Sequence, residues 1–237
     1  MLASAALIIG AHQYGHPKMG SRLASTLRVV FWIYASFAYI VGVALNLMIF
    51  SGRHILARDM TPAWMLPIFP VILTGTVAGV LASTLEPEHA FPIVIAGLTF
   101  QGLGTIVSIL VSAIYMFRLF QEGLPAPDAR PGMFLAVGPP AFTAVAFIKL
   151  GIAIPPEYSY FQAHPGSMFV LKTLSVFLAI FFWLYAFWFF SLAVISCLYV
   201  IRRMSFHLTW YAFVSNIQAE KSCSESLEAD LVFIGFP

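Results

Sequence analysis

The chain of 237 residues is 60% hydrophobic and only 9% charged, with a mean hydropathy of +0.90. Soluble domains carry about 25% charged residues, so this composition indicates an integral membrane protein. The apolar runs are too long for outer-membrane strands, which need about 10 alternating residues each, and we therefore expect an all-α membrane bundle. The net charge of +2 forms no basic patch that would indicate nucleic-acid binding.

Apolar runs predict about five full membrane spans, because roughly 20 apolar residues cross the hydrocarbon core. The predicted spans cover residues 26–50, 64–84, 91–117, 132–154 and 168–201. Residues 1–10 are expected to end one further helix, a loop follows over 11–25, and residues 205–214 are expected to begin another helix. We expect one membrane domain over 1–214 and a polar, disordered tail over 215–237.

Charges between the predicted spans indicate the orientation of the chain. Alternate loops carry arginine, namely Arg53, Arg58, Arg118, Arg130, Arg202 and Arg203. The other loops carry Glu86, Glu88 and Glu157. The positive-inside rule therefore places the arginine loops in the cytoplasm. The basic amino-terminal segment, with Lys18, Arg22 and Arg28, contradicts this pattern.

Prolines interrupt two of the predicted spans. Gly138-Pro139-Pro140 stands in the middle of the span 132–154, and Pro70 lies within the span 64–84. Proline removes a backbone donor, which a membrane tolerates only where protein or water satisfies the freed groups. Both spans should therefore be bent and face the protein interior. Bent helices mark the substrate path in many transporters, although a structural kink is an equally good interpretation of one such helix.

The bent spans also suggest an internal repeat, since they begin about 70 residues apart. The first is followed by a longer, straighter span and the second by a long aromatic span. Pro70 and Thr74 share the four-residue step of Pro139 and Thr143. Such a repeat predicts hairpins in a quasi-symmetric ring around a central pore, with the bent helices inside. Chance similarity in an apolar chain is the alternative.

The bent spans supply candidate pore-lining residues. These are Pro70, Thr74, Gly138, Pro139, Pro140 and Thr143, with Phe213 as a residue that could plug the pore. Hydroxyls and exposed N–H groups bind an anion without holding it tightly. The same small residues, with Gly75 and Gly79, also suit tight helix packing. Lys149 and Lys172 are candidates to attract anions, and snorkelling to the interface is the alternative.

Other signatures of chemistry are missing from the sequence. No hydrolase, phosphate-binding or zinc-protease motif occurs, so we expect neither an enzyme nor a cofactor. His12 and His16 share the spacing of one helix face, but Gly15 and Pro17 argue against a helix there, and we expect no metal site.

Three segments resemble one known family of membrane proteins. They are residues 131–143 around the Gly-Pro-Pro, residues 65–70 (Met-Leu-Pro-Ile-Phe-Pro), and residues 206–213 (Phe-His-Leu-Thr-Trp-Tyr-Ala-Phe). They resemble the seventh, fifth and ninth helices of the tellurite-resistance/dicarboxylate transporter family. This family includes fungal malic acid transport proteins, fungal sulfite efflux pumps and plant guard-cell anion channels.

The resemblance implies ten helices in five hairpins around a central pore, often as a homotrimer in the plasma membrane. It implies transport of small anions, with malate favoured and sulfite second, gated by a phenylalanine on the ninth helix. Against this pattern, the chain is expected to lack two helices and part of a third. Its ninth helix is expected to break at Ser215, which leaves Phe213 as a nearby gate candidate and makes a non-conducting fragment or subunit the alternative.

Overall fold

The computed structural model describes residues 2–19, 21–52 and 59–204, together with residues 221, 224, 225 and 227. All regular secondary structure in these residues is helical. In chain order the elements are α1 (Leu2–Met19), α2 (Ser21–Ser51), η2 (Pro62–Ile68), α3 (Phe69–Ala82), α4 (Pro87–Glu122), η3 (Pro127–Val137), α5 (Gly138–Ile152), α6 (Ser159–Ala163), α7 (Pro165–Val200) and η4 (Ile201–Arg203). The elements labelled η are 3-10 helices.

Five helical segments of the described chain are long and apolar enough to cross a membrane. They are Leu23–Ser51, Pro62–Ala82, Pro87–Glu122, Pro127–Ile152 and Pro165–Val200. These segments confirm the five predicted spans and the all-α membrane class. The longest have 36 residues, and at 1.5 Å per residue each measures about 54 Å, so they tilt within or extend beyond a core of about 30 Å.

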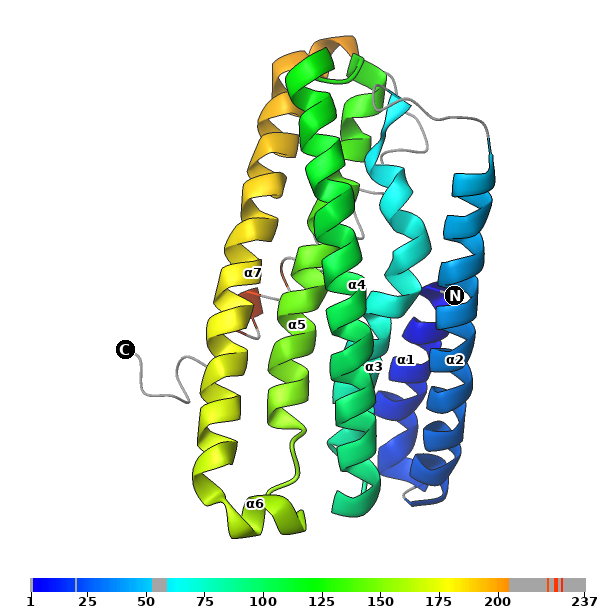
Figure 1. Ribbon diagram of the computed structural model, residues 1–237, viewed down its shortest axis with the longest axis vertical. Coiled ribbons are helices and arrows are strands. Elements are labelled where there is room, and N and C mark those ends of the chain that lie inside the picture. The colour runs from blue at the N-terminus through cyan, green and yellow to red at the C-terminus, as the bar shows by residue number, and fades with distance from the viewer. Residues whose placement is uncertain are drawn as a thin grey trace.

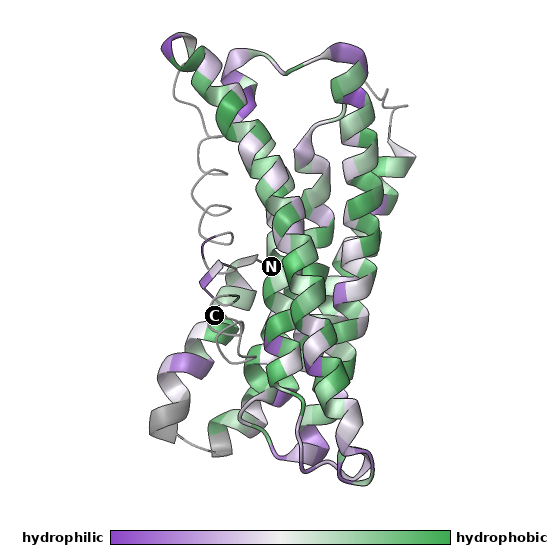
Figure 2. Ribbon diagram, turned by 90° about the vertical axis from the view of Figure 1, so that its left-hand side faces the viewer, coloured by the Kyte–Doolittle hydropathy of each residue, from purple (hydrophilic) through white to green (hydrophobic). Residues whose placement is uncertain are grey.

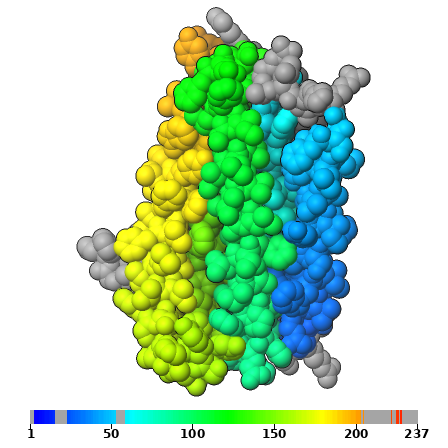
Figure 3. Space-filling model, viewed as in Figure 1, coloured from blue at the N-terminus to red at the C-terminus, as the bar shows by residue number. Residues whose placement is uncertain are grey.

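The two proline-containing spans lie inside the bundle, as their sequence predicts. Their most apolar windows are 89% and 78% buried, whereas those of the spans formed by α2, α4 and α7 are 22%, 44% and 28% buried. Figure 1 shows α5 between α7 and α4, with α3 beside α4 and near α1 and α2. The face shown in Figure 3 is built mainly by side chains of α7, α4 and α2. The bent spans are therefore the inner helices and the straight spans the outer ones.

The outer helices present apolar side chains to the surroundings. Phe37, Ile106 and Phe177 are examples from α2, α4 and α7, each more than half exposed. Figure 2 shows apolar residues along the middle of the bundle and hydrophilic ones gathered towards its two ends. This distribution suits a bundle whose middle faces lipid and whose two ends face water.

Glycines allow the inner helices to approach their neighbours closely. A Cβ on Gly79 of α3 would lie 2.6 Å from Cβ of Lys149 on α5, and one on Gly104 of α4 would lie 2.5 Å from the side chain of Ile72 on α3. A Cβ on Gly97 of α4 would collide with Ala78. Small residues at helix contacts are the usual way to pack helices in lipid, where no hydrophobic effect drives association.

The charged residues of the described loops gather at the two ends of the bundle. Glu86 and Glu88 lie at the start of α4, at the end that also carries α6, and Arg118 and Arg130 lie at the opposite end together with Glu122 and Asp128. α2 begins at the end of the bundle that also carries α6 (Figure 1), so Arg28 in its early turns lies towards that end and departs from the charge rule.

The predicted loop over residues 11–25 is wrong. α1 continues through Gly15 and Pro17 to Met19, and α2 begins at Ser21. A Cβ on Gly15 would lie 2.6 Å from the Leu23 side chain, so this glycine allows α1 and α2 to pack closely instead of ending the helix. The buried His12 ring places Nε2 2.8 Å from the hydroxyl of Thr84, which fastens α1 to the α3–α4 turn.

The predicted helix over residues 205–214 and its gate candidate Phe213 lie outside the described residues. Four residues of the predicted tail are described. Leu227 is buried against Ala144 and Ile148 of α5, and Trp183 of α7 donates a hydrogen bond to the Ser224 hydroxyl at 3.0 Å.

Candidate functional site: the breaks of the two inner helices

The first break lies between η2 and α3. Pro70 has no N–H to offer the carbonyl of Leu66, one turn earlier, so the N–H of Phe69 bonds to that carbonyl at the tighter 3-10 spacing. Thr74 then donates its hydroxyl to the carbonyl of Pro70 at 3.1 Å. A threonine hydroxyl bound to the carbonyl four residues earlier tends to bend a helix. The sequence Phe-Pro with Thr four residues on therefore encodes a local change from 3-10 to α-helix.

The second break, between η3 and α5, repeats this arrangement. Pro139 and Pro140 follow Gly138, whose N–H bonds to the carbonyl of Leu135. Thr143 donates its hydroxyl to the carbonyl of Pro139 at 2.7 Å. Elements η2 and η3 contact each other, as do α3 and α5. The two breaks are thus adjacent, and the four-residue step noticed in the sequence corresponds to the same hydrogen bond in both.

A buried polar cluster joins the second break to the outer helix α4. The Nε2 group of Gln101 donates to the Thr143 hydroxyl at 2.8 Å, and the Thr105 and Thr143 hydroxyl oxygens are 3.1 Å apart. Gln101 and Thr143 are fully buried, and Thr105 is 7% exposed. Because Thr105 also donates to the Gln101 carbonyl at 2.7 Å, the cluster links two helices through hydrogen bonds deep in the bundle.

A single hydrogen bond joins the first break to the outer helix α2. The hydroxyl of Tyr34, which is 5% exposed, donates to the carbonyl of Pro70 at 3.0 Å. Sequence reasoning missed Tyr34, Gln101 and Thr105. Gln101 carried a usable signal, since a neutral amide in the middle of an apolar span needs a partner in the bundle. The role of Tyr34 carried none, because its partner is a backbone carbonyl.

The six described pore-lining candidates are all buried in this chain. They are Pro70, Thr74, Gly138, Pro139, Pro140 and Thr143. The structure brings them together at the two breaks. The glycines of α3 pack against neighbouring helices, with Gly75 against Gln101 and Gly79 against Lys149.

Lys149 and Lys172 lie towards the end of the bundle that carries α6. Lys149 is in the last turn of α5, Lys172 is in an early turn of α7, and both are partly buried. Gly151 packs against Ser175, which brings these two helix ends together. At the opposite end, Arg130 of η3 donates from Nη1 to the carbonyl of Ser196 at 2.8 Å and so fastens η3 to α7.

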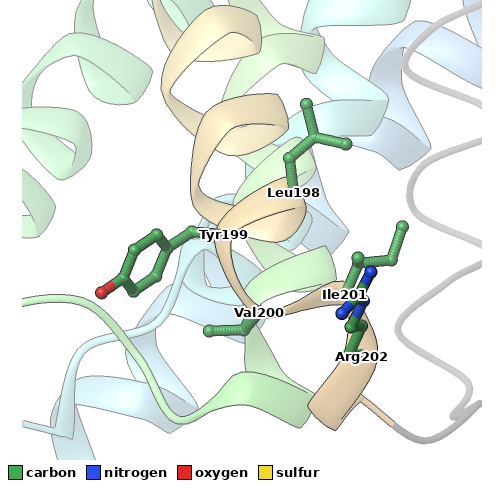
Figure 4. A pocket seen from close by; sticks show the side chains of 5 residues that line it. All are labelled: Leu198, Tyr199, Val200, Ile201 and Arg202. Atoms are coloured by element: carbon green, nitrogen blue, oxygen red, sulfur yellow. The ribbon is translucent and has the colours of Figure 1, made fainter.

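Two surface hollows among the described residues lie away from the breaks. One, of about 430 Å³, surrounds the end of α7 and is lined by Leu198, Tyr199, Val200, Ile201 and Arg202. In Figure 4 the Tyr199 ring points away from Ile201 and Arg202, so these side chains do not converge on a common point. The other, of about 500 Å³, is lined by side chains of α7 alone, mostly aromatic. Neither includes a residue of the breaks, and no group of three metal-ligating side chains occurs in the part of the chain that the structure describes.

Comparison with known proteins connects this architecture to a family. The chain matches the voltage-dependent anion channel family over residues 1–215. It belongs to this family. The resemblance noted in the sequence is thereby confirmed.

Several curated relatives of this anion channel family member are transport proteins. A malic acid transport protein of Schizosaccharomyces pombe is 36% identical over 205 residues, which are 85% of this chain and 47% of that protein. A putative malic acid transport protein of the same yeast is 30% identical over 217 residues, covering 90% and 50%. A sulfite efflux pump of Trichophyton rubrum is 22% identical over 188 residues, covering 78% and 49%. The chain therefore spans about half the length of these relatives. No solved structure matches it.

Proposed function

We propose that this family member carries small anions, C4-dicarboxylates such as malate first, across the plasma membrane along a path beside the breaks of α3 and α5. The observation that supports this proposal is the paired break, in which two adjacent inner helices each combine a proline with a threonine hydroxyl at mid-span. α3 contains no charged residue, and α5 contains only Lys149 near its end. With no fixed positive charge near the breaks, a path beside them would hold an anion weakly enough to release it.

The comparison with relatives supports malate over sulfite. Identity to the two malic acid transport proteins is 36% and 30%, against 22% for the sulfite efflux pump. Lys149 and Lys172 would raise the local concentration of a dianion at the end of the bundle that carries α6. A homotrimer, as the resemblance implies, would give each protomer its own path.

The experiment is an uptake assay with the purified protein in liposomes, using labelled malate, sulfite and chloride in parallel. The proposal expects saturable malate uptake that unlabelled malate inhibits and that exceeds sulfite uptake. Folded protein that passes none of the three anions would contradict the proposal. Faster passage of sulfite than malate would reverse the order of substrates.

A further inference from the structure

Side chains from two outer helices reach the breaks of the two inner helices in a related way. Tyr34 of α2 donates to the carbonyl of Pro70 at 3.0 Å. Gln101 of α4 donates to the hydroxyl of Thr143 at 2.8 Å, and that hydroxyl donates to the carbonyl of Pro139 at 2.7 Å. Both hydrogen-bond routes end on the carbonyl of the proline at the break. We infer that Tyr34 and Gln101 are equivalent positioning residues, each fixing the bend of the inner helix that follows its own outer helix.

The positions of the two residues in the chain agree with this equivalence. Tyr34 lies close to the middle of α2 (Ser21–Ser51), and Gln101 lies close to the middle of α4 (Pro87–Glu122). Tyr34 and Gln101 stand about 70 residues apart in the chain, which is also the spacing between the two breaks. An outer helix followed by a bent inner helix is thus one repeated unit, and the unit includes a polar side chain that bonds the outer helix to the break.

The surroundings of Gln101 indicate that its placement is costly. Its Oε1 atom is buried and has no hydrogen-bond partner, although Nε2 is bonded to Thr143. Oε1 faces Gly75 of α3, and a Cβ on that glycine would collide with it. A buried polar atom without a partner is destabilising and calls for an explanation. An apolar side chain of the same shape would avoid the cost, so the amide at this position is best explained by its bond to the break.

The inference rests on the proposed anion transport and deepens it. A helix interrupted by a proline can bend over a range of angles unless further contacts restrain it. A hydrogen bond from the neighbouring outer helix restrains the angle and therefore the position of the threonine hydroxyl. Tyr34 and Gln101 should accordingly act on the rate of transport without contacting the anion.

The test uses two nearly isosteric substitutions, Tyr34→Phe and Gln101→Met, in the full chain reconstituted in liposomes. Each should lower the maximal rate of malate uptake per folded molecule by about three- to tenfold, the kinetic equivalent of one lost buried hydrogen bond, with KM changed less than twofold. The control is Ser108→Ala, because Ser108 is equally buried on α4 but donates only to its own helix, to the Thr105 carbonyl at 2.8 Å. It should keep the wild-type rate.

Each result decides the inference. Wild-type rates for both variants overturn it, and a loss in only one overturns the equivalence. If Gln101→Met is not recovered folded, Thr143→Val removes the acceptor of the same hydrogen bond and should lower the rate by a similar factor. A wild-type rate for that variant would also overturn the role of Gln101.

A stability measurement separates this inference from the proposed function. Thermal unfolding in detergent of Gln101→Met, Thr143→Val and the double variant forms a double-mutant cycle that needs no transport. The Tm of the double variant should be no more than slightly below the Tm of the less stable single variant, because the two substitutions remove the same hydrogen bond. Strictly additive losses would overturn the proposed contact. If the cycle shows coupling but wild-type protein passes no anion, the proposed transport fails and the contact stands.

Discussion

The close contact of α3 and α5 at Gly79 gives a sharp prediction for Gly79→Ala. The added Cβ would lie 2.6 Å, 2.8 Å and 2.9 Å from Cβ and the carbonyl carbon of Lys149 and from the nitrogen of Leu150. Two of these three atoms belong to the backbone of α5, so no side-chain rotation relieves the overlap. The helices must separate by about 0.8 Å to restore an ordinary contact distance of about 3.4 Å, which is a large displacement in a close-packed interior.

The cost of this separation follows from measured overpacking. Extra methyl groups in a well-packed core cost about 1–3 kcal/mol. For a protein of this size, each kcal/mol lowers Tm by about 2–4 °C, so Gly79→Ala should lower Tm by roughly 2–12 °C. The assay is thermal unfolding in detergent, monitored by the loss of monodisperse protein on size-exclusion chromatography.

Gly102→Ala provides a matched control within α4, since nothing lies within 4 Å of the position where its Cβ would stand. Replacing a helical glycine by alanine removes a helix penalty of up to about 1 kcal/mol, so Tm should stay constant or rise by about 2–4 °C. An unchanged Tm for Gly79→Ala would refute the packing role and indicate that Gly79 faces open space.

Three further predictions concern the ends of the bundle. Arg130→Gln should lower Tm by about 3–12 °C in the same assay, because it removes a charge-assisted bond to α7 worth about 1.5–3 kcal/mol. Lys149→Gln combined with Lys172→Gln should raise the KM for malate about threefold or more at low salt and much less at 0.5 M salt, since screening weakens attraction at a distance; a salt-independent effect would argue against electrostatic attraction. When a variant without its native cysteines is expressed in intact cells, an impermeant maleimide added outside should label Glu88→Cys and not Glu122→Cys, since the arginine-bearing loops face the cytoplasm. The opposite pattern would reverse the orientation.

Much of the fold follows from the sequence because lipid restricts the secondary structures that can span a membrane. Long apolar runs must be helices, and prolines within them must be shielded from lipid, so the inner position of α3 and α5 was predictable. The four-residue step from Pro70 to Thr74 and from Pro139 to Thr143 also predicted a shared local geometry, which the two hydroxyl-to-carbonyl bonds confirm.

Other features depend on tertiary contacts that one sequence does not encode locally. Gly15 and Pro17 are poor helix residues, yet α1 continues through them because Gly15 packs against Leu23 and His12 contacts Thr84. A glycine such as Gly79 suits both a pore lining and a close helix contact, so the sequence does not distinguish the two roles. The structure shows the close contact with α5.

The candidate site was predictable in part. The prolines and threonines of the breaks were identified from their spacing, but the residues that hold them came from outer helices distant in sequence. Tyr34 lies 36 residues before Pro70, and Gln101 lies 42 residues before Thr143. Each is a polar group within a predominantly apolar span, and its partner becomes apparent only when the two helices are placed side by side.

The most direct test of the central proposal is labelled malate uptake into liposomes containing the purified protein, with Thr143→Val measured beside wild type. We expect saturable malate uptake by the wild type, a slower maximal rate for the variant, and weaker transport of sulfite. Folded wild-type protein that carries no malate above empty liposomes, or a Thr143→Val rate equal to wild type, would contradict a path for small anions beside the breaks of α3 and α5.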